Sequence, residues 1–139
     1  MRIERLGPAD VDRVVAASAL FDEPATVEWA NRFFASHGHH LLFATVDAED
    51  VGFASGVETT HPDKGTEMFL YELGVEGSAR GRGVGRALVA ALGDLARELG
   101  CYGMWVSSES DNAAALATYR SAGADEPQAG VVLTWTFHT

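Results

Sequence analysis

The most informative segment of the chain is Arg80-Gly81-Arg82-Gly83-Val84-Gly85-Arg86. Apolar residues recur after it at helical spacing, at Val84, Leu88, Leu92, Leu95 and Leu99, so the glycines are predicted to lie at the first turn of a helix. The backbone N–H groups at a helix start have no partners within the helix and carry partial positive charge. Glycine lets a ligand approach the backbone, and arginine pairs well with phosphate oxygens. The segment is therefore predicted to bind phosphate.

Two familiar phosphate-binding motifs do not match this segment. A P-loop ends in Gly-Lys followed by Ser or Thr, and the only lysine, Lys64, lies outside the segment. A dinucleotide fingerprint needs a third glycine, but Gly83-Val84-Gly85 is followed by Arg86-Ala87-Leu88. The pattern Gln/Arg-x-x-Gly-x-Gly/Ala is satisfied by Arg80, Gly83 and Gly85. Taken alone, it fits a Gly/Arg-rich surface turn that caps a helix equally well.

The flanking sequence predicts a strand before this segment, then a helix, a second strand and a second helix. The strands are Glu67–Val75 and Cys101–Ser107, both rich in apolar and β-favouring residues. The second helix runs from Ala113 to Ala122, with Asn112 at its N-cap and Tyr119 near its end.

This order of elements resembles the GNAT superfamily of N-acetyltransferases, in which such a loop holds the pyrophosphate of acetyl-CoA. Asn112, Ala115, Tyr119 and Gly123 match the family's pattern in the second helix. The resemblance covers Glu67–Gly123 well and the two ends loosely. It implies acetyl-CoA as the cofactor and an α/β (α+β) fold. The expected fold is a single mixed, largely antiparallel twisted sheet of about six to seven strands, flanked by about four helices.

The remaining sequence is consistent with one domain over residues 1–139. Further elements are predicted as a strand at Met1–Leu6, helices at Pro8–Phe21 and Ala25–Ser36, a hairpin of His40–Asp47 and Val51–Thr60, and a last strand at Val131–Phe137. No apolar run approaches the ~20 residues of a membrane helix, and the first residues lack a secretory signal. The single cysteine, Cys101, has no partner for an internal disulfide. We therefore expect a cytoplasmic protein without membrane association.

The charge balance narrows the classes of partner. Twenty acidic residues against ten basic ones give a formal net charge of −10, which disfavours nucleic acid as a ligand. An acidic surface attracts cations and so suits a small cationic amine as substrate, although the same charge serves solubility alone. His37, His39 and His40 stand without acidic or thiol neighbours at ligand spacing, so no metal site is predicted.

Two residues are candidates for proton transfer. Glu72 is a carboxylate preceded by Met68 and Leu70 on the expected strand face, close to the cofactor site, and partial burial would help it accept a proton. A solvent-facing or arginine-paired glutamate is the open alternative. The resemblance to GNAT enzymes implies that Tyr119 protonates the coenzyme sulfur, whereas a core tyrosine with a purely packing role is the alternative.

The resemblance also implies which residues hold the cofactor. Backbone groups of Leu73, Gly74 and Val75 would pair with the pantetheine arm where the strand bulges or splays. The loop Arg80–Arg86, with Asn112 and Tyr119, would complete the cofactor site.

Within the family, the segment Tyr71–Val75 looks most like that of aminoglycoside 3-N-acetyltransferases, with Glu72 in place of Asp and Gly74 in place of Ala. The acceptor would then be a polycationic aminosugar held by carboxylates at Asp22, Glu23, Glu72, Asp125 and Glu126. Another small amine or a protein amine is the alternative acceptor, and a non-catalytic acyl-CoA sensor is the alternative of another class. The last strand with Trp135 makes a homodimer possible.

Overall fold

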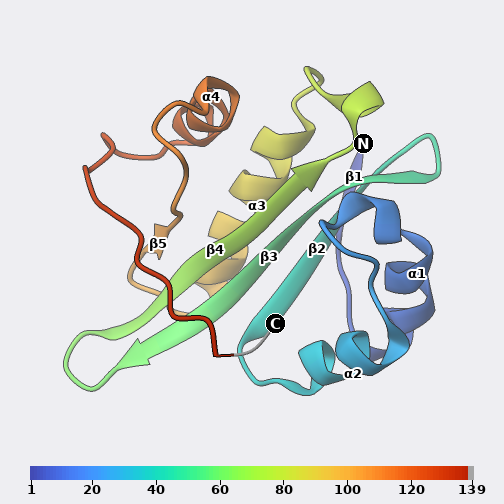
Figure 1. The fold of residues 1–139 in the computed structure, drawn as a ribbon, viewed down its shortest axis with the longest axis horizontal. Coiled ribbons are helices and arrows are strands. Elements are labelled where there is room, and N and C mark those ends of the chain that lie inside the picture. Colours follow the sequence, from blue (N-terminus) through green and yellow to red (C-terminus); the bar gives the residue numbers. More distant parts are fainter. Residues whose placement is uncertain (138–139) are drawn as a thin grey trace.

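The computed structural model describes residues 1–137, which form one five-stranded sheet in the order β1-β2-β3-β4-β5. The strands are β1 (Arg2–Arg5), β2 (His39–Val46), β3 (Glu49–His61), β4 (Gly65–Val75) and β5 (Met104–Trp105). The first four are antiparallel to their neighbours, and β5 is parallel to β4. The predicted mixed, largely antiparallel sheet is confirmed, but with five strands rather than six to seven (Figure 1).

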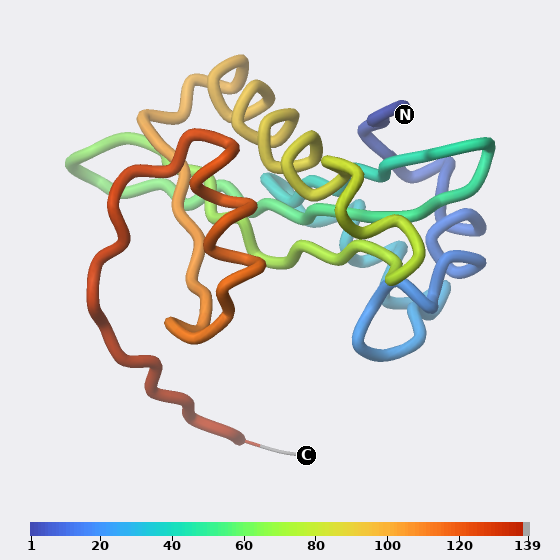
Figure 2. The backbone as a smooth tube through the Cα atoms, turned by 90° about the horizontal axis from the view of Figure 1, so that it is seen from above, coloured from blue at the N-terminus to red at the C-terminus, as the bar shows by residue number. Residues whose placement is uncertain are grey.

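Helices cover both faces of this sheet. They are α1 (Val11–Ala16), α2 (Val27–Ala35), α3 (Val84–Glu98) and α4 (Ala113–Ser121), with short 3-10 turns at Pro8–Asp10, Ser18–Leu20 and Gly77–Ala79. Figure 2 shows α3 on one side of the sheet and α1 with α2 on the other. No helix among residues 1–137 is long and apolar enough to cross a membrane.

Two apolar clusters, one on each face, hold these layers together. Under α3, the side chains of Met68, Leu70, Leu88 and Leu92 are fully buried. Under α1 and α2, the buried residues include Phe43 and Phe53 of the sheet and Val14 and Ala30 of the helices. Alternation along β3 explains the division, because Phe53 faces α1 and α2 while Ala54 faces α3.

The predicted helix at Pro8–Phe21 is wrong as a single element, because the chain turns after α1. The Ser18 hydroxyl donates to the carbonyl oxygen of Val15 at 2.6 Å and accepts from the N–H of Ala25 at 3.1 Å. These bonds compete with continued helix geometry. Phe21 is then extended, with φ −99° and ψ 161°. The apolar periodicity of this stretch continues through the break, so it did not reveal the turn.

The predicted strand at Val131–Phe137 is also wrong, since this segment pairs with no strand of the described sheet. Its alternation is suited to a strand, but a strand needs a partner edge, and β5 is only two residues long instead of the predicted Cys101–Ser107. Figure 2 shows the segment running away from the sheet. Trp135 is consequently 73% exposed, and the other apolar residues of this segment are also exposed.

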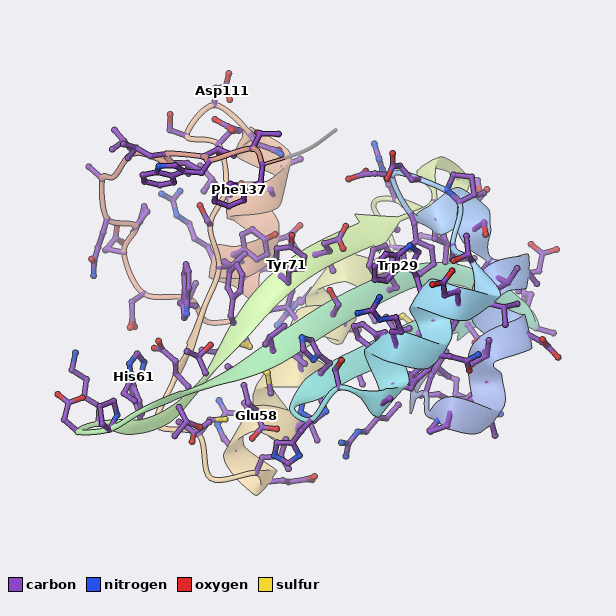
Figure 3. The ribbon with its side chains drawn as sticks, turned by 60° about the horizontal axis from the view of Figure 1, so that its bottom comes forward. Trp29, Glu58, His61, Tyr71, Asp111 and Phe137 are labelled. Carbon is purple, nitrogen blue, oxygen red and sulfur yellow. The ribbon has the colours of Figure 1, made fainter. Side chains whose placement is uncertain are left out.

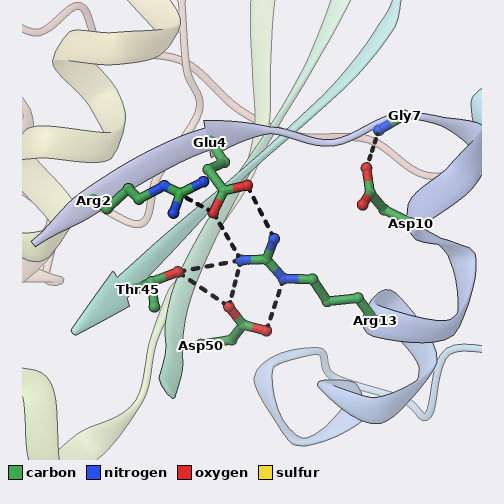
Figure 4. Close-up of polar contacts among 7 residues, drawn as sticks. All are labelled: Arg2, Glu4, Gly7, Asp10, Arg13, Thr45 and Asp50. Carbon is green, nitrogen blue, oxygen red and sulfur yellow. Dashed lines mark hydrogen bonds and ion pairs between the residues drawn. The ribbon is translucent and has the colours of Figure 1, made fainter. Parts of the chain in front are cut away.

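A network around Arg13 fastens α1 to the sheet (Figure 4). The Arg13 guanidinium lies 2.7 Å from the carboxylate of Asp50 and 3.2 Å from that of Glu4, and it also donates to the hydroxyl of Thr45. The hydrogen bond from Arg13 lowers the pKa of Asp50 below its ordinary value. These groups join α1 to β1 and to both strands of the β2–β3 hairpin.

Replacing Asp50 with Asn is expected to lower the free energy of unfolding by about 2 kcal/mol at neutral pH, because Arg13 loses a charge-assisted bidentate partner. A carboxyl group whose pKa is lowered on folding stabilises the protein above its unfolded pKa, and this contribution is lost as the pH falls through the folded pKa. The difference from the wild type should therefore shrink in acid, which urea unfolding at neutral pH and at about pH 3 measures. Asp12→Asn, an exposed position of α1 without an ion pair among the described residues, is the control. An Asp50→Asn deficit that is the same at both pH values would contradict this account.

Candidate active site

A β-bulge at Tyr71 determines where Glu72 points. Ser55 of β3 lies opposite Glu72 and the next residue, Gly56, lies opposite Leu70, so β4 carries Tyr71 as an extra residue. An extra residue reverses which face the following side chains take. Leu70 belongs to the cluster under α3, whereas Glu72 lines a hollow on the opposite face. The expectation that Glu72 shares a face with Met68 and Leu70 is therefore wrong.

The hollow lies between α2 and the sheet and has a volume of about 490 Å³. Aromatic side chains make up much of its lining, namely Phe21, Trp29, Phe33, Phe53, Phe69 and Tyr71. Figure 3 shows Trp29 of α2 and Tyr71 of β4 on this side of the sheet. Glu72 is the only carboxylate among its described lining residues.

The surroundings of Glu72 favour its protonated form. Partial burial raises the pKa of Glu72 above its ordinary value, and the nearby carboxylate of Asp22 raises it further. No arginine lies within ion-pairing distance of Glu72 among residues 1–137. The position thus differs from both alternatives considered from the sequence, a solvent-facing glutamate and an arginine-paired one. A carboxylate with a raised proton affinity is suited to accept a proton from a ligand.

The Arg/Gly loop lies where the sequence predicts it, at the start of α3. Gly81 and Gly83 adopt φ values of +78° and +79°, a region that favours glycine, and Gly83 is the N-cap of the helix. Arg80, Arg82 and Arg86 are exposed, and the Arg80 side chain donates to the carbonyl oxygen of Val75 at 3.3 Å. Backbone N–H groups and arginine side chains are therefore available to an anion at this helix start.

Beside this loop, the edge of β4 lies open. β5 pairs with β4 only at Met68 and Phe69. The N–H of Glu76 bonds to β3, at the carbonyl oxygen of Val51, so alternation turns the backbone groups of Leu73 and Val75 toward the open edge. The sequence places the departure from regular pairing at Leu73–Val75, whereas the bulge itself lies at Tyr71. Gly74 permits close packing on the other side, because a Cβ there would stand 2.6 Å from the ring of Phe53.

α4 lies close to the loop and brings Tyr119 toward α3. A Cβ on Gly85 would stand 3.2 Å from Thr118, so glycine permits this approach. Tyr119 packs against the cluster under α3, and burial raises the pKa of its hydroxyl, which keeps the group protonated. The side-chain oxygen of Asn112 accepts from the N–H of Ala115 at 3.1 Å, so this oxygen caps α4 as predicted.

The carboxylates predicted for the acceptor do not form one group. Asp22 lies near enough to Glu72 to affect its pKa, and Glu23 follows Asp22 in the same exposed segment. Asp125 and Glu126 lie in the exposed chain after α4 and do not line the hollow. Among the residues that the structure describes, no group of three or more His, Cys, Asp or Glu could hold a metal ion.

Sequence reasoning missed several residues of the hollow, above all Ser55, Trp29 and Tyr71. Phe53, Ser55 and Val57 alternate along β3, and this pattern was a usable signal that Ser55 shares a face with core residues. The helical spacing of Trp29 and Phe33 predicts an inward-facing side of α2, but no local pattern places that side over Ser55.

Comparison with known proteins assigns the chain to a family. Residues 11–124 match the family model described as Acetyltransferase (GNAT) family. The chain belongs to this family. It is 36% identical over 124 residues to the N-alpha-acetyltransferase RimI of Mycobacterium tuberculosis, covering 87% of this chain and 76% of that protein.

Solved structures support the same GNAT fold. An aminoglycoside acetyltransferase from an uncultured soil metagenomic sample, in complex with trehalose, superposes with a TM-score of 0.85 at 19% identity, covering 99% of this chain and 96% of the other. The aminoglycoside N-acetyltransferase AAC(6')-Iy, in complex with CoA, gives a TM-score of 0.80 at 18% identity, covering 96% and 93%. At these identities the likeness concerns the fold.

GNAT acetyltransferases use acetyl-CoA, and the residues of this chain fit that molecule. Exposed arginines and positive-φ glycines at the start of α3 suit a diphosphate, while the open edge of β4 offers backbone groups to an amide-bearing arm.

Replacing Gly83 with Ala is expected to weaken acetyl-CoA binding about tenfold, because alanine lets the free loop leave the left-handed conformation, and binding must then restore it at a cost of about 1–2 kcal/mol. A Cβ at Gly83 meets nothing within 4 Å, so the loss would come from the backbone conformation alone. Titration calorimetry with acetyl-CoA measures the effect. Gly77→Ala is the matched control, since a Cβ there also meets nothing and Gly77 does not have a positive φ. Equal affinities in the two variants would contradict the role of the loop conformation.

Proposed function

We propose that this GNAT chain acts as one catalytic domain over residues 1–139 and acetylates a primary amine bound beside Glu72. The observation that carries the proposal is the bulge at Tyr71. It orients the half-buried carboxylate of Glu72 toward the aromatic hollow, next to the open edge of β4. A non-catalytic acyl-CoA sensor would need the Arg/Gly loop but no carboxylate in such a position. The enzyme is therefore favoured over the sensor.

The residues divide the chemistry between them. Acetyl-CoA supplies an acetyl group activated as a thioester. An amine is protonated at neutral pH and must lose a proton before it can attack, and Glu72 accepts that proton directly or through water. Tyr119, kept protonated by its surroundings, donates a proton to the leaving thiolate. Backbone N–H groups at Leu73 and Val75 and the loop Arg80–Arg86 hold and orient the donor.

The hollow supports an amine that is attached to an apolar group, such as the α-amino group of a polypeptide. Its lining is mostly aromatic and aliphatic and contains one carboxylate, Glu72. A single cationic nitrogen would be neutralised there, while an apolar side chain would bury its surface against Trp29 and Phe33. The 36% identity to an N-alpha-acetyltransferase is in line with this acceptor.

An aminoglycoside is the second candidate acceptor, with the 3-N position as the finer prediction from the sequence. Asp22 and Glu23 stand on an exposed segment beside Glu72 and could neutralise further ammonium groups. The similarity of Tyr71–Val75 to aminoglycoside enzymes also supports it. Polyamines and amino acids are further acceptors to test.

The experiment that separates these acceptors measures thiol release from acetyl-CoA with a panel of amines. The panel contains phenylalanine amide, a tripeptide with a free α-amine, a gentamicin-type and a kanamycin-type aminoglycoside, spermidine and a lysine side-chain peptide. Turnover with the α-amines is the expected result. Turnover confined to aminoglycosides would support the second candidate, and tight acetyl-CoA binding without turnover on any amine would favour the sensor.

Two further predictions stay proposals. The exposed apolar segment Val131–Phe137, including Trp135, would become buried if it paired with a second copy of the chain, which is how we envisage a homodimer. A cytoplasmic location is also retained from the sequence.

A further inference from the structure

Ser55 is a buried polar residue without a partner. Its side chain is 5% exposed, and no hydrogen-bonding group of the described residues contacts its Oγ. Buried hydroxyl groups in proteins are almost always hydrogen-bonded, because an unsatisfied one loses its interactions with water and gains nothing in return. Ser55 also lines the aromatic hollow, where an entering ligand would supply the missing partner.

The position of Ser55 in the sheet places it beside Glu72. The two residues are opposite each other on β3 and β4 and face the same hollow, and Leu41 of β2 lies on the other side of Ser55. Side chains opposite each other on neighbouring strands have Cβ atoms about 5 Å apart. One nitrogen atom between them can therefore reach both groups.

The residues next to Ser55 on the same face of the sheet offer few other hydrogen-bonding groups to that nitrogen. On one side, Phe53 lies between Phe43 and Gly74, and the row is apolar. On the other side, Val57 lies opposite His39, whose Nδ1 is also buried without a partner among the described residues. His39 is two residues from Leu41 along β2, or roughly 7 Å, so a nitrogen atom held between Ser55 and Glu72 is too far from it for a hydrogen bond. Ser55 Oγ is therefore the buried, unpaired polar atom that lies directly opposite Glu72 in the hollow.

Resting on the proposed function, we propose that Ser55 positions the acceptor amine by accepting a hydrogen bond from one of its N–H groups while Glu72 accepts another. A protonated primary amine has three N–H groups. Glu72 takes one proton as the lone pair becomes free, and Ser55 keeps its hydrogen bond to the neutral amine. The N–C bond to the acetyl carbon then forms, the C–S bond breaks, and the thiolate receives its proton from Tyr119. The nitrogen loses its second proton through water to the Tyr119 phenolate, which restores the hydroxyl, and Glu72 releases the first proton to solvent. Ser55 transfers no proton itself.

Ser55→Ala tests this role, because a residue that positions the amine and a residue that only packs in the core give opposite results when the hydroxyl is removed. Removing an unpaired buried hydroxyl should leave the thermal unfolding midpoint unchanged or raise it. The same change should raise the KM for phenylalanine amide about tenfold, as expected for one lost hydrogen bond. The Kd for acetyl-CoA and the acid limb of the pH profile should stay as in the wild type. Thr59→Ala, which removes an exposed hydroxyl from the same strand, is the control.

The outcomes separate the two proposals. An unchanged KM in Ser55→Ala, whatever the unfolding midpoint, would overturn the role of Ser55 while leaving the acetyltransferase activity intact. A wild type that acetylates no amine of the panel would overturn the proposed function and the role of Ser55 together. A raised KM with undiminished stability would support Ser55 as a positioning residue, since a serine retained only for packing gives no such combination.

Discussion

Glu72→Gln is expected to lower kcat about a thousandfold, because the site loses the group that accepts the proton of the amine. The substitution keeps the size of the side chain, and Glu72 lies on the face opposite the Arg/Gly loop's helix, so the Kd for acetyl-CoA should change little. Steady-state kinetics with phenylalanine amide and calorimetry with acetyl-CoA measure the two quantities. Glu28→Gln is the matched control, since it removes an exposed carboxylate of α2 that does not line the hollow.

The pH dependence gives a second test of Glu72. Burial and the charge of Asp22 raise the pKa of Glu72 above its ordinary value of 4.5, so kcat/KM should fall as the pH drops through this raised pKa. Asp22→Asn should move that acid limb to lower pH. Wild-type turnover in Glu72→Gln would contradict the assignment of Glu72 as the proton acceptor. An acid limb at the same pH in Asp22→Asn and the wild type would show that a group other than Glu72 sets the acid limb.

The same shift has a consequence for stability. A carboxyl group whose pKa is raised on folding stabilises the protein below its unfolded pKa, and this contribution is lost as the pH rises through the folded pKa. At neutral pH the ionised Glu72 therefore lowers the free energy of unfolding. Glu72→Gln should be at least as stable as the wild type at neutral pH while being nearly inactive.

Tyr119→Phe is expected to lower kcat about a hundredfold, because the leaving thiolate loses its proton donor. The ring that packs against the cluster under α3 is kept, so the free energy of unfolding should stay close to that of the wild type. Tyr102→Phe is the control, as Tyr102 is exposed and donates to Glu67. Nearly unchanged turnover in Tyr119→Phe would mean that this tyrosine serves packing alone.

Local signals in the sequence predicted the Arg/Gly loop and α4 well. Gly81 and Gly83 take the positive φ values that glycine permits, and Asn112 caps α4 through its own side chain. Each of these features depends on residues within one turn of each other. Such features can be predicted from a single segment.

Features that depend on a partner strand were not predictable in the same way. The bulge at Tyr71 is a matter of register between β3 and β4, and the residues of β4 by themselves do not reveal it. Without the bulge, strict alternation would place Glu72 on the face that buries Leu70 under α3. Val131–Phe137 shows the converse, since strand-like alternation there is not matched by an available edge.

The hollow was the least predictable part of the site. It combines Trp29 of α2 with Ser55 of β3 and Glu72 of β4, which are brought together by the packing of α2 on the sheet. The two acidic residues after α4, Asp125 and Glu126, were grouped with Glu72 by resemblance alone. Because neither residue lines the hollow, the preferred acceptor moves from a polycation toward an amine with an apolar neighbour.

The central claim is that this chain transfers an acetyl group from acetyl-CoA to a primary amine beside Glu72. The most direct measurement is mass spectrometry of phenylalanine amide after incubation with acetyl-CoA and the wild type, with free thiol measured in the same reaction. We expect N-acetylated phenylalanine amide and free thiol in equal amounts, with both nearly absent in Glu72→Gln. Free thiol without an acetylated amine, or equal yields of product from the wild type and Glu72→Gln, would contradict the account.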